Sequence, residues 1–572
     1  MNRQFPFMLI LLFAVVSRCT AQVPPGATIP WTTYEAEQMR TTGKVIGPAY
    51  DPYQVETESS GQRAVLLRSQ NEYVEFTAVA PANSIVIRYS VPDGKDGKGL
   101  PYALKLSVYG KWIQYFTVSS HYAWLYGKYP FTNNPGDGRP RHFYDEIRLN
   151  NLRISKGDLI RIQPDDDHTS NTGVCIIDLA DLEAVPPPLQ APANALSVKD
   201  SIFGAPDHAA DYTEAFQKCI AKAAETGKTV WIPAGRYTLT HNLVMPANIR
   251  IQGAGMWYTQ LTGDQALYTR ADRRVRLIGT GSNIHLAGFS IIGELNYRSD
   301  EEANDGITGS FGTNSTIDGL WIEHTKVGMW IENSTNLTIS GCRIRNTLAD
   351  GINFCVGMHH STIDNCTTRG TGDDGFAIWP AVFKQQQFSP GFNVITHCTA
   401  QLPYLANGAA IYGGESNTIQ DCAFSDISQG AAILISTTFP TENKSVHNNF
   451  SGTTTIRSCT ITTSGGFDHE WGWRAAIEIC LDKRSITGIA ITDVAIDQSI
   501  SNAINIIAKD APGTSVSLQD ATLQNVRVGS YGKGIKEAYG LFIADGAYGA
   551  LTIHESEIPR IHKNTHFTIS SQ

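Results

Sequence analysis

Two neighbouring stretches decide the fold: NLTISGCRIRNTLADGINF over residues 336–354 and STIDNCTTRGTGDDGFAIW over residues 361–379. Each runs through an alternating strand, a cysteine, a polar turn, a glycine and a second strand. Segments beginning at Asn393, Asn417 and Thr454 repeat this order. A pattern that recurs every few tens of residues is the signature of a solenoid, in which each repeat forms one coil stacked on the last. The repeats therefore predict a parallel β-helix.

A cysteine occupies the same place in each repeat. The five are Cys342, Cys366, Cys398, Cys422 and Cys459. Equivalent positions in successive coils stack about 4.8 Å apart, so we expect an interior ladder of small apolar thiols. The alternative is disulfide bonding, because stacked Cα atoms lie within disulfide reach and an exported chain meets oxidising conditions. We expect reduced, buried thiols, since an even ladder packs without pairing.

The same register aligns two aspartates. Asp350 lies eight residues after Cys342, and Asp374 lies eight residues after Cys366; each is followed by glycine and an apolar strand. They should be vertical neighbours, with Asp373 displaced along the turn. Asp-Gly pairs are ordinary turn formers, but no turn requires three clustered carboxylates. We therefore interpret the three residues as functional.

Clustered carboxylates fit two kinds of chemistry. An inverting glycosidase needs an acid for the leaving oxygen and a base for water, about 6.5–9.5 Å apart. Asp350 and Asp374 can hold the water, while Asp373 reaches the glycosidic oxygen. The alternative is a lyase, in which the aspartates bind Ca²⁺ and a basic residue accepts the proton. Its candidate bases are Arg343, Arg345 and Arg369.

Composition narrows the class of protein. The 572 residues are 42% apolar and only 17% charged, with 51 glycines, which favours a mainly β protein. The formal net charge is −9, and no basic stripe is present, so nucleic acid is not an expected partner. Residues 1–21 have the pattern of a secretory signal peptide. We expect a secreted protein without a membrane span; Cys19 raises lipoprotein anchoring as the alternative.

Two regions follow the leader. Residues 22–185 contain short alternating stretches and turn clusters, which predict a β-sandwich of the jelly-roll kind. A proline-rich linker spans residues 186–197. Residues 198–572 carry the repeats, preceded by a helix expected over residues 211–226. The expected fold is thus all-β, a sandwich joined to a parallel β-helix.

Both ends of the sandwich sequence resemble carbohydrate-binding modules of the family 6 and 35 type. The resemblance rests on TTYEAEQM at its start and GVCIIDLADLEAV at its end. It implies a structural calcium held by Glu35, Glu37 and Asp178. The alternative is that these are edge-strand charges. The sequence entering the repeats, with FGA, a helix and then VWIPAGRY, resembles the start of a right-handed, pectate-lyase-like β-helix. In that fold the helix covers the open first coil.

The pattern ADGINF, a spacing of 23 residues from Asp350 to Asp373, and GTGDDGFAIW resemble glycoside hydrolase family 87. The resemblance extends from about residue 30 to near the C-terminus. It implies an inverting α-1,3-glucanase or mycodextranase, expected to be endo-acting and monomeric, with an α-glucan partner and no catalytic cofactor. Asp373 would be the acid, with Asp350 and Asp374 activating water. The GHG turn and RIK tripeptide of family 28 do not occur in the sequence.

Other residues are candidates for sugar binding. They are Asp305, Trp379, Tyr412, Glu415, Asp468 and Trp471. The alternatives are core packing for the aromatic residues, a turn for Asp305 and solvated loop charges for the other acids. Three other functions stay open: a dextranase-like hydrolase, a polysaccharide lyase and a non-catalytic glycan-binding protein.

Overall fold

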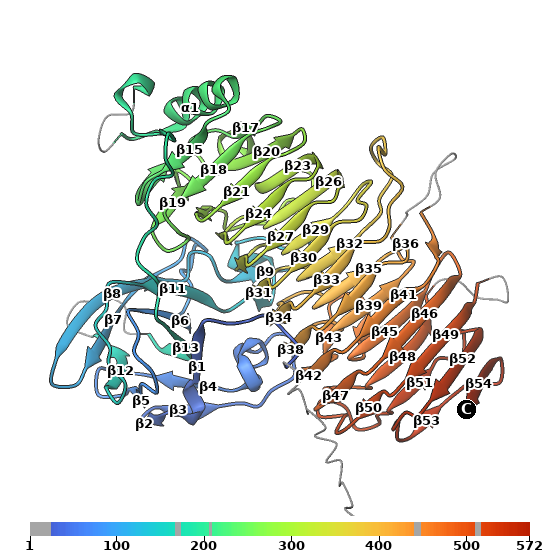
Figure 1. The fold of residues 1–572 in the computed structure, drawn as a ribbon. Helices are drawn as coiled ribbons and strands as arrows, with labels where there is room; N and C mark the ends of the chain where they lie inside the picture. The colour runs from blue at the N-terminus through green and yellow to red at the C-terminus, as the bar shows by residue number, and fades with distance from the viewer. Residues whose placement is uncertain (1–23, 166–172, 205–208, 440–447, 510–515, 572) are drawn as a thin grey trace, which may run out of the picture.

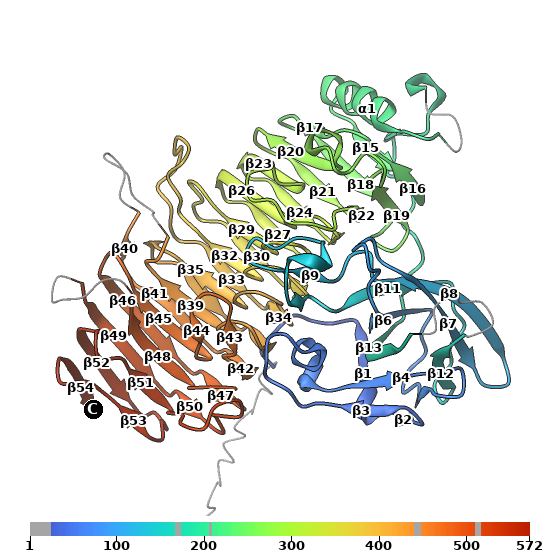
Figure 2. The same ribbon diagram turned by 180° about the vertical axis from the view of Figure 1, so that it is seen from behind.

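The computed structural model describes residues 24–165, 173–204, 209–439, 448–509 and 516–571. The predicted leader over residues 1–21 lies outside them. The described chain forms an N-terminal sandwich lying against the flank of a long coil of strands (Figures 1 and 2).

The sandwich is built from two antiparallel sheets whose apolar faces meet. The first has the order β11-β6-β13-β4-β3, with β1 also pairing with β13. Its strands are β1 Trp31–Glu35, β3 Lys44–Ile46, β4 Ala64–Leu67, β6 Ser84–Ser90, β11 Asp145–Leu149 and β13 Cys175–Glu183. The second has the order β2-β5-β12-β7-β8. Its strands are β2 Arg40–Thr41, β5 Val74–Thr77, β7 Pro101–Val108, β8 Trp112–Ser119 and β12 Leu159–Pro164. Alternate side chains of each strand point inward, so apolar residues from both sheets fill the core; examples are Ile85, Leu104 and Ile160.

The rest of the chain winds into a right-handed parallel β-helix, as the repeats predict. Among the described residues its coils stack into three parallel sheets of 14, 11 and 12 strands. The 14-stranded sheet runs from β14 (Leu196–Ser197) to β54 (Phe567–Ser571), so the first coil already includes the end of the predicted linker. The 12-stranded sheet positions the site. Its central strands are β20 Arg276–Thr280, β23 Gly306–Thr313, β26 Met329–Thr335, β29 Ile352–Phe354, β32 Phe376–Ile378, β35 Ala409–Ile411 and β39 Ile433–Ser436.

A single helix, α1 (Thr213–Thr226), covers one end of the coil within the described chain (Figure 1). Asp211 accepts hydrogen bonds from the Thr213 amide and hydroxyl groups, and Gly227 ends the helix with φ of 65°. Its buried side chains recur at helical spacing and face the first strands; they include Phe216, Cys219, Ile220 and Ala223. No helix in the described chain has the length and apolarity needed to cross a membrane.

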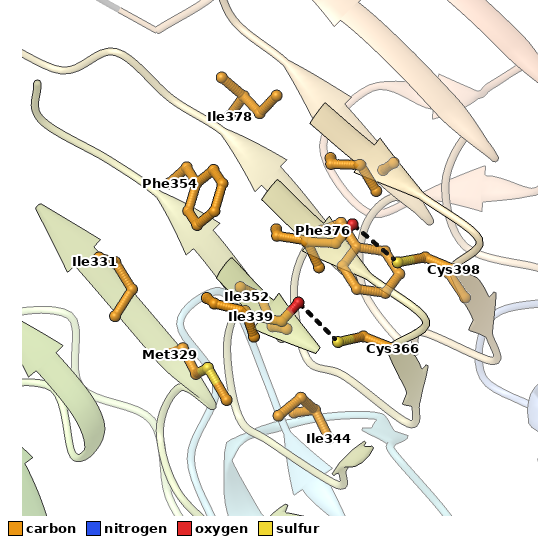
Figure 3. Close-up of a cluster of buried hydrophobic side chains, with 14 of the residues drawn as sticks. Met329, Ile331, Ile339, Ile344, Ile352, Phe354, Cys366, Phe376, Ile378 and Cys398 are labelled. Atoms are coloured by element: carbon orange, nitrogen blue, oxygen red, sulfur yellow. Dashed lines mark hydrogen bonds between the residues drawn. The ribbon is translucent and has the colours of Figure 1, made fainter. Parts of the chain in front are cut away.

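The interior is a set of stacked side chains, and the predicted cysteine ladder is part of it (Figure 3). The Cys366 thiol lies 3.8 Å from the carbonyl oxygen of Ile339, one coil away, and Cys398 makes the same contact with Ile363 at 3.6 Å. Every cysteine in the described ranges is free and buried. The structure therefore favours thiols over disulfides.

Thiol titration checks the ladder. Protein unfolded without reductant is expected to react with Ellman's reagent at no fewer than the nine cysteines that the structure describes. The folded protein should react far more slowly, because all nine of these thiols are buried and the reagent cannot reach them. A lower count after unfolding would reveal disulfides.

The sandwich is held against the 11-stranded sheet by buried ion pairs. Arg343 on β28 (Arg343–Arg345) donates two hydrogen bonds to Glu183, at 2.7 and 2.8 Å. Arg369 on β31 (Thr367–Arg369) donates to Glu146 at 2.5 Å and to Asp181 at 2.7 Å. These arginines, with Arg345, point into the interface. The lyase alternative, in which one of them accepts a proton beside the aspartates, is therefore not supported by their position.

Candidate active site

Three aspartates meet on the turn that leads into the 12-stranded sheet. Asp350 precedes β29, and the pair Asp373–Asp374 precedes β32, whose first residues align as Ile352 opposite Phe376. The Gly351 amide donates to the Asp374 carbonyl at 2.9 Å, which locks the two turns one above the other. One carboxylate oxygen from each aspartate lies within 4.8 Å of the others. The structure thus confirms the predicted vertical alignment.

Glycine allows the two turns to come so close. A Cβ atom on Gly351 would lie 2.3 Å from the Gly375 carbonyl oxygen. On Gly372, it would lie 2.4 Å from the Leu348 carbonyl oxygen. Neither separation leaves room for a methyl group. Backbone approach, and not an unusual φ, therefore explains these two glycines.

Asp350 and Asp374 are buried and differently supported. Asp350 accepts a hydrogen bond from the side-chain amide of Asn353 at 2.8 Å. Burial, followed by the charges of Asp373 and Asp374, raises the pKa of Asp350 well above the usual value. Asp374 accepts from the Asn407 side chain at 2.8 Å and from the Tyr412 hydroxyl at 2.7 Å. Burial and then Asp373 raise the pKa of Asp374 to about 7. Together the two groups can hold a proton near neutral pH.

The raised pKa of Asp374 makes a prediction about stability. Its pKa is about 7 in the fold and about 3.9 in an unfolded chain. The fold therefore favours the protonated group, and its contribution to stability is lost as pH rises from about 4 to about 7. Asp374→Asn removes this loss, since the amide stays neutral. We expect the variant to gain melting temperature over the wild type at pH 8 and to gain little at pH 4. An equal change at both values would contradict the prediction.

Asp373 differs from its neighbours because it faces the cleft. Its side chain is 29% exposed, and its Oδ2 atom accepts a hydrogen bond from Arg298 at 2.8 Å. Arg298 lies in the loop between β22 (Ser290–Ile292) and β23, and Tyr129, from a loop of the sandwich, contacts it there. The sandwich thus contributes a side chain to the site.

The cleft in front of the aspartates has a volume of about 660 Å³. Part of the lining is an aromatic wall: Trp330 and Trp379 meet edge to face at 5.7 Å, and Phe383 and Phe439 extend it. The lining also includes polar residues, among them Arg276, Arg298, Asp300, Glu302 and Asn304. Aromatic faces together with hydrogen-bonding groups suit a sugar ring, which has both kinds of surface.

Two of the predicted sugar-binding residues line this cleft. They are Trp379 and Tyr412. Tyr412 is nearly buried, however, and its hydroxyl group holds Asp374. Trp379 presents the stronger case for sugar contact, because its ring belongs to the aromatic wall.

The other four predicted sugar-binding residues are not among those that line this cleft, and sugar binding by them stays a prediction. Asp305 is buried and accepts from the Tyr268 hydroxyl and the Lys326 amide, which is the turn alternative. Glu415 is exposed on the short strand β36 (Gly414–Glu415). Asp468 accepts from the backbone amides of Glu470 and Trp471, which shapes its own loop. Trp471 packs against a buried cluster that includes Tyr412 and Leu434, with Lys509 over its ring.

The predicted calcium ligands lie near the boundary with the β-helix, where Asp426 joins them. Buried oxygens of Glu35 and Glu37 have no hydrogen-bond partner, and burial, aided by neighbouring carboxylates, raises the pKa of Glu35 to about 8. Such oxygens suit a hard cation. Asp178, however, already pairs with Arg88 at 2.5 Å. Calcium at these residues stays a prediction. Among the described residues, the group that can bring three carboxylates to one ion is the active-site trio.

Comparisons with known proteins agree with this geometry. Family models of the α-1,3-glucanase catalytic domains D1 and D2 match residues 28–185 and 211–551. The catalytic unit of a thermostable GH87 α-1,3-glucanase from Streptomyces thermodiastaticus strain HF3-3 is 28% identical, with a TM-score of 0.79; the match covers 95% of this chain and 96% of that one. A GH87 α-1,3-glucanase catalytic domain in complex with nigerose is 26% identical, with a TM-score of 0.80, over 95% and 98% of the chains. An aspartate-to-alanine form in complex with tetrasaccharides is 26% identical, with a TM-score of 0.82, over 96% and 99%. Comparison with curated proteins found no match.

Proposed function

The chain belongs to the α-1,3-glucanases of glycoside hydrolase family 87, and from this premise we propose that it is a secreted, inverting, endo-acting hydrolase of α-1,3-glucan. The observation that carries the proposal is the meeting of Asp350, Asp373 and Asp374 in one cleft. Among the related structures, three different aspartates were each changed to alanine. Two of those positions are adjacent, and the third precedes the first of them by 23 residues, which is the spacing from Asp350 to Asp373 here.

The roles follow from burial and exposure. Asp373 faces the cleft and protonates the glycosidic oxygen, while Asp350 and Asp374 hold and deprotonate the attacking water. The three carboxylate oxygens lie within 4.8 Å of one another. This distance is shorter than the separation of about 6.5–9.5 Å between acid and base that is typical of an inverting glycosidase. It suits one water bound by two carboxylates, since two hydrogen bonds of about 2.8 Å that meet at an open angle span roughly that distance. A shared water of this kind is the feature on which the proposed inversion depends.

The length of the cleft supports binding within a chain rather than only at its end. Its lining comes from seven consecutive coils, those of β20, β23, β26, β29, β32, β35 and β39. Coils stack about 4.8 Å apart, which leaves room for several sugar units. Action outside the cell follows from the leader pattern and from a polymeric substrate.

One digestion tests the proposal. Purified protein is incubated with insoluble α-1,3-glucan, and dextran serves as the comparison polymer. Early products are sized by chromatography, and their anomeric form is read by proton NMR before mutarotation. Mixed oligosaccharides that are first released as β-anomers support endo action with inversion. Early α-anomers would overturn inversion, unsaturated products absorbing in the ultraviolet would indicate a lyase, and binding without new reducing ends would indicate a glycan-binding protein.

A further inference from the structure

Arg298 is nearly buried, and its guanidinium group donates hydrogen bonds to the side chains and backbone carbonyls that surround Asp373. Its Nε atom donates to Asp300 at 2.9 Å, and its Nη1 atom donates to the carbonyl oxygens of Leu348 and Gly372 at 3.2 and 3.0 Å. The two carbonyls belong to the turns that carry Asp350 and Asp373. Arg298 therefore ties these turns together at the point where the carboxylates must keep their spacing.

The remaining arm of Arg298 reaches Asp373 and the sandwich. Its Nη2 atom donates to Asp373 Oδ2 at 2.8 Å and to the Tyr129 hydroxyl oxygen at 2.7 Å. Tyr129 donates in turn to Asp300 at 2.7 Å, and its ring stacks on His469 with centroids 5.3 Å apart. A residue of the sandwich thus closes a network that ends on a carboxylate of the β-helix.

We propose that Arg298 is a positioning residue for Asp373, and that Tyr129 and Asp300 complete this role by fixing and partly neutralising the guanidinium group. The inference rests on the proposed function, in which Asp373 is the acid. A guanidinium N–H directed at Oδ2 leaves Oδ1 as the oxygen for the transferable proton. An acid whose proton sits on one fixed oxygen is aligned with the leaving group before the substrate arrives.

Charge explains why Asp300 belongs to the network. A cation in contact with a carboxyl group favours its ionised form, which is the wrong form for an acid. Asp300 is a second anionic partner of Arg298, so the guanidinium charge is shared between two carboxyl groups. Four other charged or acidic groups surround the pair: Asp350, Asp374, Lys326 and His469. Two further hydroxyl groups, those of Tyr404 and Tyr412, face it from neighbouring coils.

The test compares pH profiles of kcat/KM for soluble α-1,3-gluco-oligosaccharides. Arg298→Gln removes the cation, so the alkaline limb should move to higher pH, by about one unit or more. Asp300→Asn leaves the whole cation acting on Asp373, so the same limb should move to lower pH. Tyr129→Phe keeps the ring and should lower kcat about tenfold with little change in KM. Arg457→Gln, a change to an exposed arginine of β41 (Thr454–Arg457) on the 14-stranded sheet that donates to the Gln420 side chain, is the matched control and should leave the limb in place.

A second measurement separates positioning from folding. An α-1,3-gluco-oligosaccharyl fluoride needs little protonation of its leaving group, so Arg298→Gln should lose much less activity on it than on the oligosaccharide. Two results would overturn the inference. One is an equal loss of activity by Arg298→Gln on the oligosaccharide and on the fluoride. The other is a shift of the alkaline limb in the same direction for Arg298→Gln and Asp300→Asn. If wild-type protein releases no reducing ends, or Asp373→Asn keeps full activity, the proposed function fails instead.

Discussion

Asp373→Asn is expected to lower kcat on α-1,3-glucan by about 10²–10⁴-fold, the contribution typical of a general acid. The amide has the size and shape of the carboxyl group but has no proton to give to the glycosidic oxygen. Arg298 loses one charged acceptor and keeps Asp300, the Tyr129 hydroxyl and two carbonyl oxygens. The fold should therefore survive, and KM should change little.

Initial rates of reducing-end release measure the effect. Asp318→Asn is the control: the residue is exposed at the end of β24 (Thr316–Asp318), on the 14-stranded sheet, and should leave kcat unchanged. The oligosaccharyl fluoride should be hydrolysed by the Asp373 variant with a smaller loss. Near-normal release of glucan by Asp373→Asn would remove Asp373 from the role of acid.

The second large effect is on stability. Arg369→Ala should lower the free energy of unfolding by about 3–5 kcal/mol, because removing one partner leaves buried charges uncompensated. Both partners, Glu146 and Asp181, lie in the interface with side chains 1% and 4% exposed. Activity should fall as well, since the docked sandwich supplies Tyr129 to the cleft.

Chemical denaturation followed by tryptophan fluorescence and by activity measures this effect. Arg68→Ala is the control: it removes an exposed pair with Glu72 at 3.6 Å and should cost no more than about 1 kcal/mol. Arg369→Met combined with Asp181→Asn should recover part of the loss, because Glu146 keeps the buried Arg345 as a cationic partner at 3.7 Å. A single variant as stable as the wild type would show that water reaches the pair.

The repeats made the fold and the catalytic trio predictable. A β-helix keeps one register from coil to coil, so equal distances from Cys342 and Cys366 place Asp350 and Asp374 together. For Asp305 the contacts agree with the turn alternative. Its turn occupies the equivalent place, but Tyr268 and the Lys326 amide bind its carboxylate under the preceding loops.

The rest depended on contacts that no local pattern encodes. Arg298 lies 75 positions from Asp373, and Tyr129 belongs to another part of the chain. One signal was present in RIR at residues 343–345. Charged residues flank Ile344, which fills the core, so both arginines leave the coil on its outer face. A row of arginines on an outer sheet face predicts an acidic partner, and here that partner is the sandwich.

The docking of the sandwich limits how this enzyme can be rearranged by recombination. Modules that are joined only by a flexible linker can be exchanged between enzymes, because they share no interface whose residues must match. Here a foreign module would leave Arg343 and Arg369 without their acidic partners. It would also remove the Tyr129 hydroxyl group that donates to Asp300. The sandwich and the β-helix must therefore be inherited and engineered as one unit.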